Sequence, residues 1–75
     1  MSNERRDLLR KIEALIIAIP REQEAQEYYL EREREYPDQA SKEMFRFLAS
    51  QEAWHKIQLE KILADLEEKL AGLGK

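Results

Sequence analysis

Two glutamates and the single histidine of this 75-residue chain have the types and spacing of metal ligands. Glu52 and His55 are three residues apart, so on a helix their side chains are neighbours, about 5–6 Å apart at Cβ, and can converge on one ion. Glu22 precedes Glu52 by 30 positions and would add a second carboxylate if the two segments lie side by side. Oxygen and nitrogen ligands without sulfur suit iron or manganese, with zinc as a further option.

These three polar residues interrupt two apolar stripes of helical period. Glu22 falls at an inward position of the first stripe, and Glu52 and His55 fall at inward positions of the second. An ionised carboxylate in such a place costs several kcal/mol unless it is paired, hydrogen-bonded or bound to a cation. The pattern therefore predicts a metal site. An ion pair between Glu52 and His55, with Glu22 paired to an arginine such as Arg21, would explain these inward polar residues as well.

Two long helices joined by one turn are the elements that must position these side chains. Apolar residues recur at intervals of three and four in both halves of the chain. The first stripe comprises Leu8, Ile12, Leu15, Ile19, Tyr29 and Tyr36, and the second comprises Phe45, Leu48, Leu59, Ile62, Leu66 and Leu70. We expect helices over about residues 3–36 and 38–71, within a single domain over residues 1–75.

Prolines and a glycine mark the expected helix ends and one weak point. Tyr36-Pro37-Asp38 predicts the turn, because a residue before proline disfavours the helical conformation and Asp38 can cap the second helix. Gly72 is expected to end that helix. Pro20 lies inside the first helix, where it leaves the Ile16 carbonyl without its helical partner and predicts a kink or a local break.

The composition excludes several other classes of protein. No cysteine is present, which excludes disulfides, thiolate metal ligands and thiol nucleophiles. Charged residues make up 39% of the chain, but the net charge is only −3 and no basic stripe indicates a nucleic-acid partner. The longest apolar run, residues 14–19, is far shorter than the roughly 20 residues that span a bilayer. We therefore expect a cytoplasmic protein without a membrane partner.

A hairpin of two helices is too small to bury its own apolar faces. Each helix presents an apolar face wider than one neighbour covers, and so short a chain gains only a few kcal/mol from its own core. The simplest closure is a homodimer, in which two antiparallel hairpins form an all-α four-helix bundle. Four carboxylates and two imidazoles would then meet at the two-fold axis, which is the ligand set of ferritin-like di-metal bundles.

The residues around these ligands resemble the encapsulated ferritins, a family of half-length ferritin-like proteins. The resemblance rests on residues 22–29, which read Glu-Gln-Glu-Ala-Gln-Glu-Tyr-Tyr, and on Glu52-Ala53-Trp54-His55. In that family the Glu-x-x-His motif follows the first ligand glutamate by 30 positions, as it does here. The similarity covers about residues 8–66, and it extends more distantly to one half of a rubrerythrin.

The resemblance implies a function and an assembly. Glu22, Glu52 and His55 from two chains would form a di-iron ferroxidase centre, with Tyr29 beside it, while Tyr28 stands where the family has tryptophan. Dimers would assemble into a ring such as a decamer. The oxidised iron would be stored in a separate encapsulin shell, so the resemblance places the protein inside that compartment.

One part of the family pattern is only half present. The family carries a carboxylate immediately before the ligand glutamate and another two positions after it, and together these form a site for metal uptake. Glu24 supplies the second carboxylate, whereas Arg21 replaces the first. Glu24 is therefore the candidate residue for such an uptake site.

Two other functions remain open. A rubrerythrin-like di-iron peroxidase would use the same ligands, although the cysteine pairs that normally feed electrons to such a site are absent. A non-enzymatic dimerisation module, in which polar core residues fix the register of the helices, would need no metal.

Overall fold

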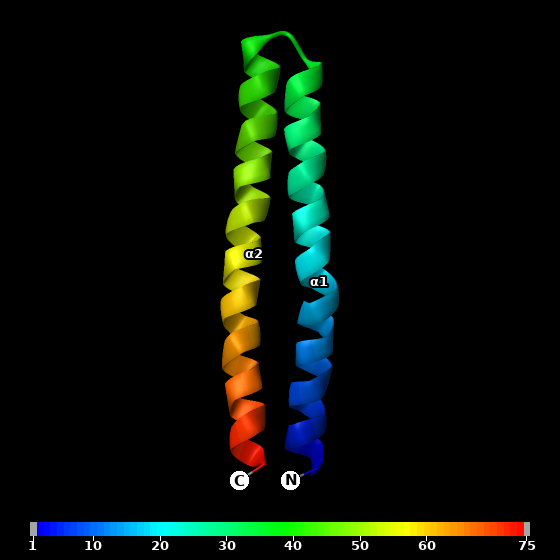
Figure 1. Ribbon diagram of the computed structural model, residues 1–75, viewed down its shortest axis with the longest axis vertical. Coiled ribbons are helices and arrows are strands. Elements are labelled where there is room, and N and C mark those ends of the chain that lie inside the picture. Colours follow the sequence, from blue (N-terminus) through cyan, green and yellow to red (C-terminus); the bar gives the residue numbers. More distant parts are fainter. Residues whose placement is uncertain (1, 75) are drawn as a thin grey trace.

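The polypeptide forms an antiparallel hairpin of two long helices (Figure 1). The structure, a computed structural model, describes residues 2–74, so Met1 and Lys75 lie outside the described residues. Helix α1 is Ser2–Glu35 and helix α2 is Gln39–Leu73. The start of α1 and the end of α2 lie at one end of the hairpin, and the turn lies at the other. The expected all-α helical hairpin is confirmed.

The start of α2 is explained by its capping residue. Asp38 is the N-cap, and its carboxylate accepts a hydrogen bond from the Ser41 backbone N–H at 2.9 Å. This bond satisfies one of the free donors in the first turn of the helix. Hydrogen bonds from the side chain and backbone of Ser41 hold the pKa of Asp38 below its ordinary value. The expected capping role of Asp38 is confirmed.

Neither Gly72 nor Pro20 ends a helix. The expectation that α2 stops at Gly72 is wrong. Of the kink or local break expected at Pro20, the break is not found, because α1 continues through the proline. Helix α2 continues through Gly72 to Leu73, and the C-cap is Gly74. A glycine inside a helix costs only about 1 kcal/mol relative to alanine, which does not terminate it. Helix α1 also continues through Pro20 as one helix, packed against α2 on both sides of the proline.

The buried core is small and lies toward the ends of the chain. Leu8, Ile12 and Leu66 form one buried cluster. Leucines 15, 63 and 70 pack against it and are partly buried. The molecule measures 57 × 14 × 12 Å, and no large side chain of the described residues is fully buried. A single hairpin thus covers only one side of each helix.

A polar contact joins the helices near the turn. Glu33 of α1 accepts two hydrogen bonds at Oε2 from Arg46 of α2, from Nε at 3.0 Å and from Nη2 at 2.7 Å. Lys42 donates to the Glu33 backbone carbonyl at 3.0 Å. These bonds fix the two helices relative to each other at the turn end of the hairpin.

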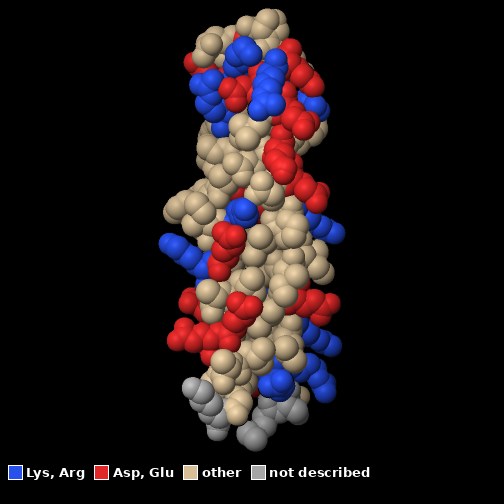
Figure 2. Space-filling model, in the orientation of Figure 1, with Lys and Arg blue, Asp and Glu red and all other residues tan. Residues whose placement is uncertain are grey.

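Large apolar side chains remain exposed along both helices. They include Leu9, Ile16, Ile17, Leu30, Met44, Phe47, Trp54, Ile57 and Ile62. Figure 2 shows uncharged residues along much of the middle of one face, with charged side chains gathered at the turn end and along the edges. None of the helices in the described part of the chain is long and apolar enough to cross a membrane.

Candidate metal centre

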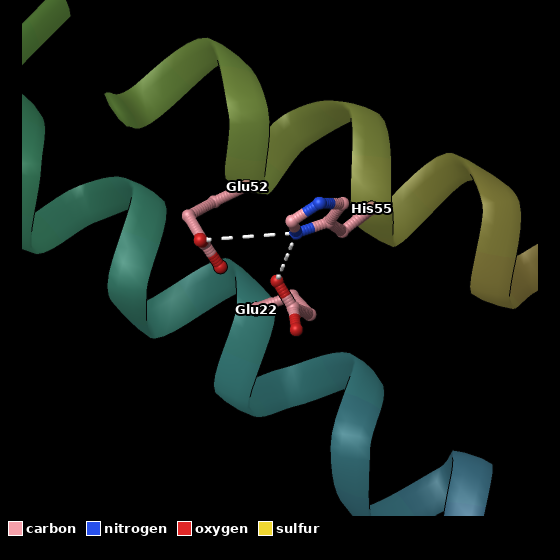
Figure 3. A group of neighbouring side chains, drawn as sticks. All are labelled: Glu22, Glu52 and His55. Atoms are coloured by element: carbon pink, nitrogen blue, oxygen red, sulfur yellow. Dashed lines mark ion pairs between the residues drawn. The ribbon is translucent and has the colours of Figure 1, made fainter. Parts of the chain in front are cut away.

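Glu22, Glu52 and His55 meet near the middle of the hairpin (Figure 3). Each residue offers one ligand atom, and these three atoms lie within 4.8 Å of one another. Glu22 projects from α1, whereas Glu52 and His55 project from α2 one helical turn apart. The antiparallel packing of the helices therefore brings together all three residues that the sequence singled out as ligands.

The contacts among these side chains are longer than good hydrogen bonds. His55 Nδ1 lies 3.5 Å from Glu22 Oε2 and 3.8 Å from Glu52 Oε1, whereas N–H···O bonds in proteins usually measure about 2.7–3.2 Å. Glu22 Oε2 is also shielded from solvent and has no hydrogen-bond partner among residues 2–74. A buried oxygen without a partner is costly, and a bound cation would satisfy it.

The Glu22 carboxyl group influences the protonation of Glu52. The neighbouring Glu22 carboxyl, which can share a proton with Glu52, is the main cause that raises the pKa of Glu52. Partial burial and the negative charge of Glu22 also raise this pKa, and His55 opposes the effect. The side chains of Glu22 and Glu52 are only 25% and 22% exposed, so water screens their repulsion incompletely. Without a cation, Glu52 therefore holds a proton more readily than an isolated glutamate does. A cation would displace that proton.

The donor set fits a transition metal ion but is incomplete within one chain. Two carboxylates and one imidazole, with no sulfur, suit iron or manganese, and zinc is also compatible. Such ions take four to six ligands, so three side chains leave positions open. The His55 side chain is 47% exposed, which shows that the cluster opens to the surface on the histidine side.

The alternative in which an arginine neutralises Glu22 is not found. Arg21 is exposed, and the ion pairs of the described residues include none between an arginine and Glu22. The partner of Glu22 Oε2 in those pairs is the imidazole of His55. The contact of Glu52 with His55, which the same alternative expected, is present at 3.8 Å.

No hydrogen bond or ion pair of residues 2–74 links Tyr29 or Glu24 to the three ligand residues. The ring of Tyr29 stacks on Phe45 at a centroid distance of 6.4 Å and meets Tyr28 edge-on at 5.6 Å, and Phe45 also stacks on Tyr36 at 5.3 Å. Glu24 is exposed. The roles expected for Tyr29 and Glu24 stay predictions.

One contact beside the cluster was missed by reasoning from the sequence. Lys56 Nζ donates a hydrogen bond to Gln23 Oε1 at 2.6 Å, across the two helices. Gln23 directly follows Glu22, and Lys56 directly follows His55. Gln23 and Lys56 therefore have the same separation in the sequence as Glu22 and His55, and this equal spacing was a usable signal. The signal is weak because polar residues are frequent in so charged a chain.

Comparison with protein families gives a match that covers most of the chain. A family model described as Rubrerythrin matches residues 13–75, a span that includes Glu22, Glu52 and His55. No curated protein and no solved structure matches the chain significantly.

Proposed function

The chain belongs to the rubrerythrin family, and from this premise we propose that it binds a di-iron centre and oxidises Fe(II) to Fe(III). The observation that carries this function is the convergence of Glu22, Glu52 and His55 within 4.8 Å, around a buried Glu22 oxygen that has no hydrogen-bond partner among residues 2–74. Ligands of this type, on facing helices of a bundle, are the usual way in which ferritin-like proteins hold two metal ions.

We propose that a second copy of the chain completes the centre. One chain supplies three ligands, whereas two chains supply four carboxylates and two imidazoles. The open side of the cluster also carries apolar surface: Ile62, seven residues after His55, is 48% exposed and lines a groove with Leu15 and Leu66. A homodimer formed through this side would cover the groove and enclose the ligands in a four-helix bundle.

Larger assembly is a further part of the proposal. Phe47 and Trp54 of α2 are 51% and 54% exposed, and contacts between dimers would cover them. The resemblance to encapsulated ferritins favours a ring of dimers, such as a decamer, that delivers oxidised iron to an encapsulin shell. Burial of two large aromatic side chains would favour such association.

In the proposed reaction Fe(II) is the substrate and the side chains hold and neutralise it. Two Fe(II) ions lose one electron each, and dioxygen takes up these two electrons with two protons to become hydrogen peroxide. Glu22 and Glu52 would bind as carboxylates and His55 as neutral imidazole, with Tyr29 as a hydrogen-bond donor behind them. Because protons compete with the metal for all three ligands, iron binding should weaken in acid.

The family match also favours a second candidate, a rubrerythrin-like peroxidase. In that reaction hydrogen peroxide takes up two electrons and two protons and leaves as two molecules of water. The electrons would have to come from an external donor, because the chain has no cysteine with which to bind a second iron site. Fe(II) oxidation that is much faster with peroxide than with oxygen would favour this candidate. A chain that binds no metal would instead be a non-enzymatic dimerisation module.

Stopped-flow measurement of Fe(II) oxidation tests the proposed function. We expect Glu52→Ala and His55→Ala each to lower the initial rate by about tenfold or more, because each removes a ligand. Glu60→Ala, at an exposed position of the same helix, is the matched control and should keep the wild-type rate. Circular dichroism would verify that all variants remain helical. Equal rates in the four proteins would exclude a ferroxidase centre at these residues.

A further inference from the structure

We propose that the hydrogen bond from Lys56 to Gln23 positions the metal ligands, by fixing the register of α1 against α2 at the level of the cluster. The bond is short, 2.6 Å from Nζ to Oε1, and partly buried. Each of its residues directly follows a ligand in the sequence, so the bond joins the same two helical turns as the contact of Glu22 with His55. Lys56 and Gln23 are positioning residues for the proposed metal centre, on which this role depends.

The bond flanks the cluster on the side away from its opening. Consecutive residues are about 100° apart around an α-helix, so Lys56 and His55 project from different flanks of α2. The His55 side chain is 47% exposed on one flank. The Lys56 ammonium lies on the other flank, where it reaches across to α1 and is partly buried. The hydrogen bond from Lys56 to Gln23 therefore joins the two helices beside the ligands, on the flank opposite the exposed His55 side chain.

The apolar packing on the other side of the cluster does not fix the register with the same specificity. From the cluster toward the chain ends, the helices meet through leucine and isoleucine side chains such as Leu8, Ile12 and Leu66, and hydrophobic attraction is not directional. A slip of one helical turn would displace α1 by about 5.4 Å. That displacement exceeds the 3.5 Å between His55 Nδ1 and Glu22 Oε2, so it would remove Glu22 from the site.

Pro20 weakens α1 immediately before the ligand. It lies two residues before Glu22, and its missing N–H removes the helical hydrogen bond to the Ile16 carbonyl. A helix bends most readily at such a position. The direct tie from Gln23 to α2 would therefore restrain the turn that carries Glu22.

The contact between Arg46 and Glu33 provides a matched control. It also joins α2 to α1 through a long cationic side chain, with bonds of 2.7 and 3.0 Å, but near the turn of the hairpin. Loss of either contact should lower the stability of the hairpin. Only loss of the Lys56 contact should disturb the ligands.

Titration with Co(II) as the probe ion measures the effect on metal binding. Lys56→Met keeps most of the aliphatic side chain and removes the donor, so we expect the Co(II) dissociation constant to rise about tenfold, the order found for residues that orient ligands. Arg46→Met should stay within about twofold of wild type. Lys56→Arg, which can still donate to Gln23, should restore most of the affinity and the visible Co(II) spectrum.

Nuclear magnetic resonance of the metal-free protein provides a readout that does not depend on metal. Cross-peaks between the His55 ring and Glu22 side-chain protons should be present in wild type and Arg46→Met and weakened in Lys56→Met. Gln23→Asn, which shortens the acceptor by one methylene, gives the same comparison if Lys56→Met is poorly folded.

The two readouts separate this role from the proposed metal centre. Wild-type protein that binds no Co(II) but whose cross-peaks depend on Lys56 would refute the metal centre, although the contact would still hold Glu22 near His55. Unchanged cross-peaks in both Lys56→Met and Gln23→Asn, or equal loss of Co(II) affinity in Lys56→Met and Arg46→Met, would overturn the positioning role.

Discussion

The carboxylates of Glu22 and Glu52 are the groups whose position most needs an explanation at the scale of single residues. Glutamates on an apolar helix face are normally paired, protonated or bound to a cation. Here the Glu22 oxygen nearest His55 has no hydrogen-bond partner among the described residues, and the pKa of Glu52 is raised. Both observations indicate a site that is more stable with a cation than without one.

The raised pKa of Glu52 predicts how the stability of the metal-free protein depends on pH. Because the folded pKa exceeds the unfolded pKa, protonated Glu52 stabilises the fold below the unfolded pKa, and this contribution is lost as pH rises through the folded pKa. Glu52→Gln cannot ionise. Near neutral pH we expect the free energy of unfolding of this variant to exceed that of wild type by about 0.5 kcal/mol, the order for neighbouring like charges.

Urea denaturation with a chelator present, at several pH values, measures this difference. The advantage of Glu52→Gln should shrink as the pH falls, because wild-type Glu52 then becomes protonated too. Glu60→Gln, at an exposed position on the same helix, should show no such trend. An advantage of Glu52→Gln that is independent of pH would contradict the shared proton.

The sequence predicted which residues meet at the cluster but not how they are held there. Glu22, Glu52 and His55 were predictable because helical period alone places them on inward positions. The bond between Lys56 and Gln23 was not, because the reach of long side chains across two helices depends on the register of those helices. Register between helices leaves no periodic signal in either of them.

At the scale of helices, the short turn sets the approximate register of α1 against α2, which we propose the contact between Lys56 and Gln23 fixes at the cluster. Residues 36–38 join α1 to α2, and the cap at Asp38 fixes where α2 begins. Antiparallel packing from that point places Glu22 of α1 opposite the helical turn of α2 that holds Glu52 and His55. Apolar period and turn residues were sufficient to predict this hairpin. They were insufficient at Gly72 and Pro20, because the helices continue through both residues.

Pro20 is expected to lower the stability of α1. Pro20→Ala restores a helical hydrogen bond to the Ile16 carbonyl and removes the contact of the proline ring with that turn, so we expect the free energy of unfolding to rise by up to about 3 kcal/mol. Lys56→Met should also lower the Co(II) affinity less in the Pro20→Ala protein than in wild type, because α1 is then stiffer before Glu22. Thermal and urea denaturation measure the first effect. A Pro20→Ala protein with unchanged or lower stability would contradict it.

The whole molecule is a hairpin whose exposed apolar surface exceeds its buried core. It is 57 Å long but only 14 × 12 Å across, and only Leu8, Ile12, Ala49 and Leu66 among its described apolar residues are buried. A second copy that covers the open side of the cluster would enlarge the core and complete the ligand set together. The proposed dimerisation and metal binding are therefore linked.

Two isoleucines of similar exposure test which side forms the proposed dimer. Ile62 and Ile57 are 48% and 46% exposed, but residues five apart are about 140° apart around a helix, and Ile62 lies on the His55 side. Ile62→Glu would bury a charge in the interface, so we expect metal-dependent dimerisation to weaken at least about tenfold. Ile57→Glu should leave it nearly unchanged. Sedimentation with and without metal measures dimerisation of the two variants. A larger loss of dimerisation in Ile57→Glu than in Ile62→Glu would place the dimer contact on the other side of α2.

Anomalous X-ray diffraction at the iron absorption edge, from crystals loaded with Fe(II), tests the proposed centre most directly. We expect two iron peaks per pair of chains, each within bonding distance of Glu22, Glu52 and His55 side chains, and no peaks there in crystals of Glu52→Ala. Iron peaks located only at exposed carboxylates such as Glu24, or none at all after loading, would contradict a di-iron centre formed by these residues.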